Sequence, residues 1–193
     1  MHVEVLDCIL EKFSFLTNMF SSKPKMENLL AFLLGISLCP GSTIRSFAEW
    51  LGDWKDQSSL NRFLTEGGWK LSAFRHNYSK WIGDAVRQEK GTTYFIVDDS
   101  KAKKTGEMIE KAMMDFDPDK GRQVLCHTFV VSFVKLACGN FPFQLTLYDK
   151  TKKGKKGFKS KLDIAAEQVH EFVKCTGALT KLIFLFDSWY CCP

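Results

Sequence analysis

Apolar positions in the first 90 residues recur every three to four residues, which is the spacing of one face of an α-helix. Between breakers, this pattern predicts helices over residues 3–20, 26–38 and 70–88, with two shorter helices between the second and the third. Ser42 or Thr43 is placed to cap the first short helix, and Ser58 or Ser59 the second. We therefore expect residues 1–90 to form an N-terminal all-helical domain.

The periodicity changes after Gly91. A β-branched and aromatic run over 92–97 predicts a buried strand that stops at two acids, Asp98 and Asp99. A polar stretch follows from Ser100 to Arg122, and we expect no strand in it. The remaining elements predicted by the pattern are strands over 124–134 and 141–148 joined by a turn at Gly139-Asn140, an amphipathic helix over 160–175, and a buried strand over 181–186 that stops at Asp187.

The order strand, strand, strand, helix, strand predicts one mixed sheet within a domain over 91–193. Two tight connections make the first three strands antiparallel, and a right-handed helical crossover returns the fourth strand parallel to the first, at its free edge. This is an α/β fold of the ribonuclease-H-like kind. Because the carboxyl ends of the first and fourth strands then lie side by side, Asp98 and Asp187 are expected to share one site.

Composition narrows the class of protein further. The chain has 193 residues, 45% of them hydrophobic, and a formal net charge of +5, which fits a globular protein with a mild preference for anionic partners. Its apolar runs are far shorter than the roughly 20 residues that span a bilayer, and no signal peptide is visible, so we expect a soluble, cytoplasmic protein without a membrane partner. Seven cysteines without a Cys-x-x-Cys pair predict reduced core thiols.

The paired acids indicate metal chemistry. Phosphodiester cleavage at neutral pH is served by two divalent ions about 3.5–4 Å apart, which activate the attacking oxygen and stabilise the leaving oxygen. Magnesium prefers carboxylate oxygens, and acids at the ends of adjacent apolar strands are held rigidly while they still reach solvent. His127 lies inside an apolar strand and is expected to be a hydrogen-bonded core residue rather than a metal ligand.

Two acidic motifs carry a resemblance to a known family. The segment from Val97 to Gly106, VDDSKAKKTG, resembles the Asp-Asp-Thr-x-x-x-Lys-x-Gly stretch of bacterial insertion-sequence transposases, which are DDE superfamily endonucleases. The segment from Phe186 to Tyr190, FDSWY, resembles their second acidic motif. The helical segment around Trp54, residues 59–64 and Trp69 is similar to their N-terminal helical domain.

The resemblance implies a DNA transposase that acts through Mg²⁺ or Mn²⁺ held by Asp, Asp and Glu. In that family the first acid commonly precedes a Ser or Thr by two residues, which selects Asp98 before Ser100 as a catalytic metal ligand, with Asp99 as the alternative. Asp187 is the second metal ligand. The family's Glu comes well after the second Asp, and this sequence continues for only six residues past Asp187. We therefore expect a C-terminally truncated transposase that is inactive alone.

The resemblance also implies partners: double-stranded DNA of transposon ends and target, and a second copy of the full-length protein in a homodimer, within the bacterial cytoplasm and nucleoid. The basic residues that we expect to contact DNA are Lys101, Lys103, Lys104, Lys152, Lys153, Lys155, Lys156 and Arg62. Two other interpretations remain. One is a non-catalytic DNA-binding or regulatory fragment, and the other is a magnesium-binding phospho-receiver-like domain, whose first strand also ends in paired acids.

Overall fold

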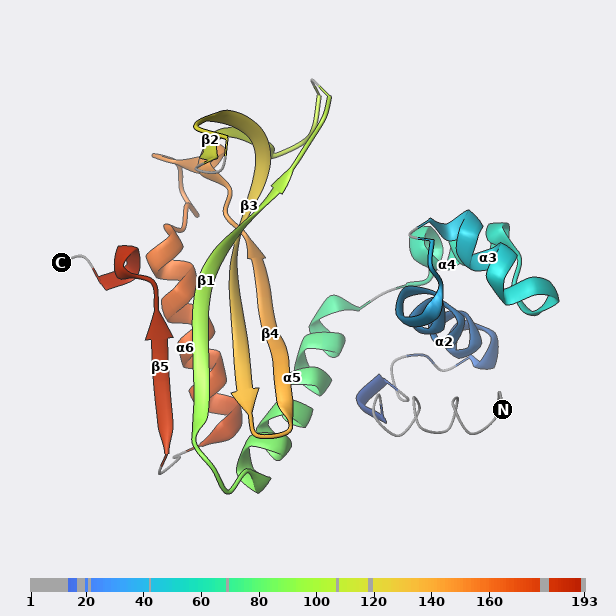
Figure 1. The fold of residues 1–193 in the computed structure, drawn as a ribbon, viewed down its shortest axis with the longest axis horizontal. Helices are drawn as coiled ribbons and strands as arrows, with labels where there is room; N and C mark the ends of the chain where they lie inside the picture. Colours follow the sequence, from blue (N-terminus) through green and yellow to red (C-terminus); the bar gives the residue numbers. More distant parts are fainter. Residues whose placement is uncertain are drawn as a thin grey trace. The chain divides into compact units, whose positions relative to one another are not determined.

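The computed structural model describes residues 14–16, 20, 22–41, 43–68, 70–106, 108–117, 120–177 and 181–191 (Figure 1). The chain divides into two compact units, Met1–Tyr78 and Ser79–Pro193. The boundary falls within helix α5 (Leu71–Gln88). Residues 71–78 of this helix belong to the first unit and residues 79–88 to the second. The helix expected over 3–20 lies largely outside the described residues, of which Ser14–Leu16 form a 3₁₀ turn, η1.

The first unit is helical, as predicted. Its further elements are α2 (Lys23–Leu38), α3 (Ile44–Leu51), the 3₁₀ turn η2 (Gly52–Trp54) and α4 (Gln57–Glu66). Leu16, Leu29 and Phe63 form one buried cluster, and Ala31, Phe47 and Leu60 form another. Apolar residues at helical spacing thus bury the faces that the sequence pattern indicated.

The two short helices are capped differently from each other. Thr43 begins α3 with a capping box, in which its hydroxyl accepts the Ser46 N–H and the Ser46 hydroxyl accepts the Thr43 N–H, each at 3.1 Å. The predicted cap of α4 at Ser58 or Ser59 is wrong. Asp56 is the N-cap, because its carboxylate accepts the Ser59 N–H at 2.8 Å, and this hydrogen bond lowers the pKa of Asp56.

The second unit contains a five-stranded mixed sheet in the order β2-β3-β1-β5, with β4 also paired to β3 (Figure 1). Its elements are β1 (Thr93–Lys103), β2 (Met113–Asp117), β3 (Arg122–Leu136), β4 (Gly139–Leu147), the 3₁₀ turn η3 (Lys150–Lys152), α6 (Lys161–Thr176), β5 (Leu182–Phe186) and the 3₁₀ turn η4 (Ser188–Cys191). β1 is antiparallel to β3 and parallel to β5, and β3 is antiparallel to β4 and β2. This confirms the predicted mixed sheet and its parallel return strand.

Two details of the sheet differ from the sequence-based expectation. The polar stretch after Ser100 is partly extended: β1 continues to Lys103, and β2 adds a strand that was not expected. Backbone pairing with the amino-terminal half of the long strand β3 stabilises both segments, although neither is apolar. The turn between β3 and β4 lies at Ala137 and Cys138, two residues earlier than the expected Gly139-Asn140.

Helices cover one face of this sheet. Phe172 of α6 packs on Phe95 of β1 and Phe143 of β4, with ring centroids 4.4 and 5.4 Å apart. Gln168 of α6, which is 1% exposed, donates hydrogen bonds to the Val130 carbonyl and the Thr146 hydroxyl. Side chains alternate along each strand, so their neighbours lie on the opposite face of the sheet. That face is partly exposed, and its side chains include Phe133, Leu145, Ile183 and Leu185.

The carboxyl-terminal part of α5 also belongs to this covered face. Arg87 donates a 2.7 Å hydrogen bond to the carbonyl of Cys175, at the end of α6. Gly83 lies against the same residue, and a Cβ atom on it would meet the Cys175 carbonyl oxygen at 2.4 Å. The close helix crossing therefore requires glycine at position 83.

The cysteines that the structure describes with their side chains, Cys39, Cys126, Cys138 and Cys175, are free thiols. Burial raises the pKa of Cys175 to about 11, which keeps this thiol protonated at neutral pH. Across the helices that the structure describes, none is both long enough and apolar enough to cross a membrane.

Candidate metal and nucleic-acid site

Asp98 and Asp187 leave neighbouring strands at the same level. β1 and β5 run parallel with Val97 opposite Phe186, which is the last pair of the register. Asp98 is the next residue on β1, and Asp187 directly follows the end of β5. Adjacent strands lie about 4.8 Å apart, and residues opposite each other in a sheet project from the same face. Both acids are exposed. The carboxyl end of β5 thus lies beside the middle of β1, where the exposed Asp98 follows the last residue paired with β5.

The neighbouring acid Asp99 points the other way. Side chains alternate along a strand, so Asp99 shares the face of the buried Val97, and Asp98 shares the open face. The Asp99 carboxylate forms an ion pair with the ammonium of Lys161, the first residue of α6, at 2.9 Å. Asp98 instead accepts the Asp99 N–H at 2.7 Å. Within the described part of the chain, a cation pairs with Asp99 but not with Asp98 or Asp187.

A tyrosine reports the electrostatic potential at this end of the sheet. The pKa of Tyr190, in η4, is raised by burial first and then by the charges of Asp99, Asp98 and Asp187. All three carboxylates therefore lie close to the same phenol, which has its ring beside Phe186 with centroids 6.3 Å apart. Ser188 donates to the Asp187 carboxylate at 3.1 Å. The result is a region of negative potential suited to a cation.

The donor set fits a hard divalent ion with two protein ligands. Magnesium is commonly held by one or two carboxylates, with water and substrate phosphates completing its octahedron. The carboxylates of Asp98 and Asp187 are exposed to solvent, and neither forms an ion pair with a basic residue in the part of the chain that the structure describes. No third His, Cys, Asp or Glu among the described residues joins them in a group able to hold a metal. The described site is therefore a pair of carboxylates.

Two lysines beside the acids are already engaged. Lys101 donates to the Phe116 carbonyl at 2.7 Å and lies 3.3 Å from the Asp115 carboxylate, and Lys103 lies 2.7 Å from the carboxylate of Asp117. Burial raises the pKa of Asp115, but its hydrogen bonds from Lys101, the Phe116 N–H and Thr128 outweigh burial, and the net pKa lies below the ordinary value. These two lysines hold β2 against the sheet.

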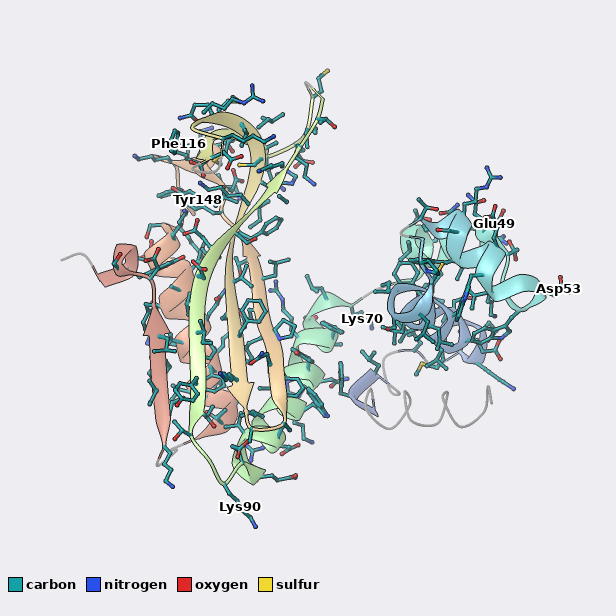
Figure 2. All side chains as sticks on the ribbon, in the orientation of Figure 1. Glu49, Asp53, Lys70, Lys90, Phe116 and Tyr148 are labelled. Atoms are coloured by element: carbon teal, nitrogen blue, oxygen red, sulfur yellow. The ribbon has the colours of Figure 1, made fainter. Side chains whose placement is uncertain are left out.

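The lysine loop, residues 149–160, is more open. It follows β4, which runs parallel to β1, and it therefore lies at the same end of the sheet as Asp98 (Figure 2, beside Tyr148). The rings of Tyr148 and Phe158 anchor it, with centroids 6.1 Å apart. Lys152 lies 3.7 Å from Asp149. The lysines of the loop that are exposed and form no ion pair with a described residue are Lys150, Lys153, Lys155 and Lys156.

The other predicted contacts are more scattered. Lys104 donates its backbone N–H to Leu125 and makes no ion pair with a described residue. Arg62 is exposed on α4, in the first unit. His127 Nε2 lies 2.8 Å from the Glu110 carbonyl oxygen. This confirms a hydrogen-bonded histidine, but the residue is half-buried rather than part of the core.

The sequence reasoning missed Lys161 and Tyr190. Lys161 was not singled out, although Ser160 can cap a helix and so places the next residue in the first turn of the helix that crosses back to β5. Tyr190 was read only as part of a motif. Its spacing of three residues from Asp187 was the available signal, because a single turn can bring such residues together.

Two exposed acids that follow the last residue pair of neighbouring parallel strands could supply carboxylate ligands to a divalent ion, and such ions serve phosphoryl transfer. Residues 16–192 match the family described as DDE superfamily endonuclease. Since the match covers most of the chain, the protein belongs to that family. Membership indicates an enzyme of the nuclease or transposase type, with DNA as substrate, and enzymes of this superfamily generally use divalent metal ions. No curated protein is significantly similar to the chain.

Proposed function

We propose that this protein is a DNA transposase of the bacterial insertion-sequence type, which cleaves transposon ends and joins them to target DNA. The observation that carries the proposal is the register of β1 and β5, with Val97 opposite Phe186. This register supports the proposal because Asp98 and Asp187 each follow a residue of its last pair, as a shared metal site would require. Family membership supports the same conclusion.

The topology supports a ribonuclease-H-like core. Three antiparallel strands, β1, β3 and β4, are followed by the crossover helix α6 and by β5, which returns parallel to β1. The same pairing argues against a phospho-receiver, because that fold is a doubly wound, parallel sheet. β1 of this protein is antiparallel to β3 over ten residue pairs from Tyr94 to Lys103.

Asp98 and Asp187 would hold Mg²⁺ or Mn²⁺, and Asp99 is the less favoured ligand because Lys161 already pairs with it. When bound, such ions activate water or a 3′-hydroxyl and stabilise the leaving oxygen. The chain's own residues bind and orient the DNA. The lysine loop is at the same end of the sheet as the acids, where its exposed ammonium groups would contact phosphates.

The helical unit would add DNA contacts through Arg62, and the complete transposase would act as a homodimer on double-stranded transposon ends and target DNA in the bacterial nucleoid. Among the described residues, no third His, Cys, Asp or Glu joins the two acids in a metal-binding group. Non-catalytic DNA binding is the second candidate function, and the same observation favours it.

DNA affinity measured with and without Mn²⁺, at constant ionic strength, tests the proposal on the chain as it exists. A metal ion shared by the acids and a phosphate would strengthen binding to duplex DNA. Asp98→Asn and Asp187→Asn should each remove this Mn²⁺-dependent increase and keep the metal-free affinity. Asp53→Asn, which changes an exposed acid of η2 in the other unit, is the matched control.

Binding that is equally strong with and without Mn²⁺ in all four proteins would support the non-catalytic function instead. Strand cleavage by the 193-residue chain would contradict the expectation of an incomplete site.

A further inference from the structure

Lys161 and Asp99 form a contact between distant segments beside the proposed metal site. Their side chains are only 15% and 20% exposed, the ammonium lies 2.9 Å from the carboxylate oxygen, and the residues are 62 positions apart in sequence. The same ammonium lies 5.8 Å from the centre of the Tyr148 ring. Lys161 is thus held between two elements, with a carboxylate on one side and an aromatic face on the other.

The position of Lys161 is fixed by α6. Ser160 and Asp163 form a capping box at the start of this helix, with the Asp163 N–H donating to the Ser160 hydroxyl at 3.1 Å. Farther along, Ile164, Ala165 and Phe172 are buried against the sheet. A cation in the first turn of a helix is disfavoured by the helix dipole, so its placement here needs a compensating partner. Asp99 is that partner.

The contact separates two adjacent acids. Asp98 and Asp99 differ by one residue on a strand, and a rotation or slip of the backbone there would exchange their faces. With Asp99 held on the α6 face, Asp98 stays on the open face, at the level of Asp187.

We infer that Lys161 is a positioning residue of the metal site: it holds Asp99 away from the ion and so selects Asp98 and Asp187 as the protein ligands. The inference rests on the proposed function, since it concerns the ligands of that site. The inference implies that the role of Asp99 depends on Lys161. That carboxylate is outside the site when Lys161 is present and becomes a ligand when the ammonium is removed.

A double-mutant cycle of Mn²⁺ affinity tests this inference on the full chain, with free Mn²⁺ followed by its electron paramagnetic resonance signal. Asp99→Asn alone should change the dissociation constant by less than about twofold. In the Lys161→Met background the same substitution should weaken binding about tenfold, which is within the range of coupling between contacting residues. A purely electrostatic effect of Lys161 predicts instead that the two substitutions act independently.

The chain offers a matched control pair at the start of the same helix. Lys159 pairs with Glu167 at 2.7 Å, and both side chains are about half exposed. Lys159→Met, alone or with Glu167→Gln, should leave Mn²⁺ affinity unchanged. Lys161→Arg keeps the charge and should restore the wild-type insensitivity to Asp99→Asn. Thermal unfolding of each variant confirms that the proteins compared are folded.

Two failures are distinguishable. If Asp98→Asn and Asp187→Asn do not weaken Mn²⁺ binding, the proposed metal site itself is wrong. If they do, but Asp99→Asn has the same effect with and without Lys161, the positioning role of Lys161 is overturned. With Lys161 present, a loss of Mn²⁺ binding in Asp99→Asn as complete as the loss in Asp98→Asn would also overturn it.

Discussion

The two halves of β1 have opposite surroundings. Thr93, Phe95 and Val97 are 3%, 0% and 1% exposed, flanked by β3 and β5 and covered by α6. Beyond Val97 the pairing with β5 stops, the strand keeps only β3 as its neighbour, and polar side chains from Asp98 to Lys103 replace the apolar ones. The inner half fixes the backbone through packing, and the outer half presents groups that can meet an ion or a phosphate.

Removing packing from the inner half should have the largest effect. Phe95 contacts Phe143, Phe172 and Phe184. Phe95→Ala should lower the free energy of unfolding by about 3–5 kcal/mol, the cost of a cavity left by a buried aromatic ring. Phe184→Ala, at the exposed edge strand β5, should cost clearly less. Urea denaturation measures both, and equal losses would contradict the distinction between a packed centre and an open edge.

The second-largest effect concerns DNA binding. The lysines of the lysine loop should contribute more to the salt dependence of DNA affinity than the lysines in the outer half of β1. Replacing Lys152, Lys153, Lys155 and Lys156 with Gln should flatten the dependence of DNA affinity on salt. Each lost phosphate contact lowers the slope of log affinity against log salt by about 0.9. Lys101→Met with Lys103→Met should change the slope little, because these ammonium groups already pair with Asp115 and Asp117. The reverse result would assign the phosphate contacts to β1.

The ion pair between Lys101 and Asp115 should make a smaller contribution to stability. Both side chains are 27% exposed, so we expect a coupling of about 1 kcal/mol in a cycle of Lys101→Met and Asp115→Asn. Because the pKa of Asp115 is lowered in the folded protein from 3.8, its contribution is present above that value and is lost as pH falls through the folded pKa. Denaturation at a series of pH values should show constant coupling well above pH 3.8 and decreasing coupling as the pH falls through the lowered folded pKa of Asp115.

The smallest effect is expected where the chemistry lies. Asp98 is exposed and its charge lies near Asp99 and Asp187, so Asp98→Asn should leave the free energy of unfolding within about 0.5 kcal/mol of wild type. A melting temperature that is unchanged or slightly raised would agree with this. A large loss of stability would mean that Asp98 supports the fold rather than a ligand.

The elements that bury an apolar face could be predicted well from the sequence, because burial imposes a periodic pattern of apolar residues. The buried half of β1, the helix after Ser160 and the strand that ends before Asp187 all follow from it, whereas the continuation of β1 to Lys103 does not. β2 could not be predicted, since its residues, MMDFD, alternate without an apolar face toward a core. It forms because β3 pairs with it and because Asp115 and Asp117 meet the lysines of β1.

The candidate site shows the same division. Local motifs indicated the acids, and the strand order derived from the pattern correctly predicted that β5 returns parallel to β1; the shared site of Asp98 and Asp187 stays a prediction. Whether a particular lysine is available could not be read from the sequence, because that depends on contacts between distant segments. Lys101 and Lys103 appeared free beside the acids but are paired with β2, and Lys161 appeared to be part of a charged loop but holds Asp99.

Mn²⁺ titration of the wild-type chain, Asp98→Asn, Asp187→Asn, Asp99→Asn and the control Asp53→Asn tests the central claim most directly. The account predicts one binding site that Asp98→Asn and Asp187→Asn each abolish, and that Asp99→Asn and Asp53→Asn leave intact. Wild-type binding in both Asp98→Asn and Asp187→Asn would contradict the claim that these two carboxylates form the metal site.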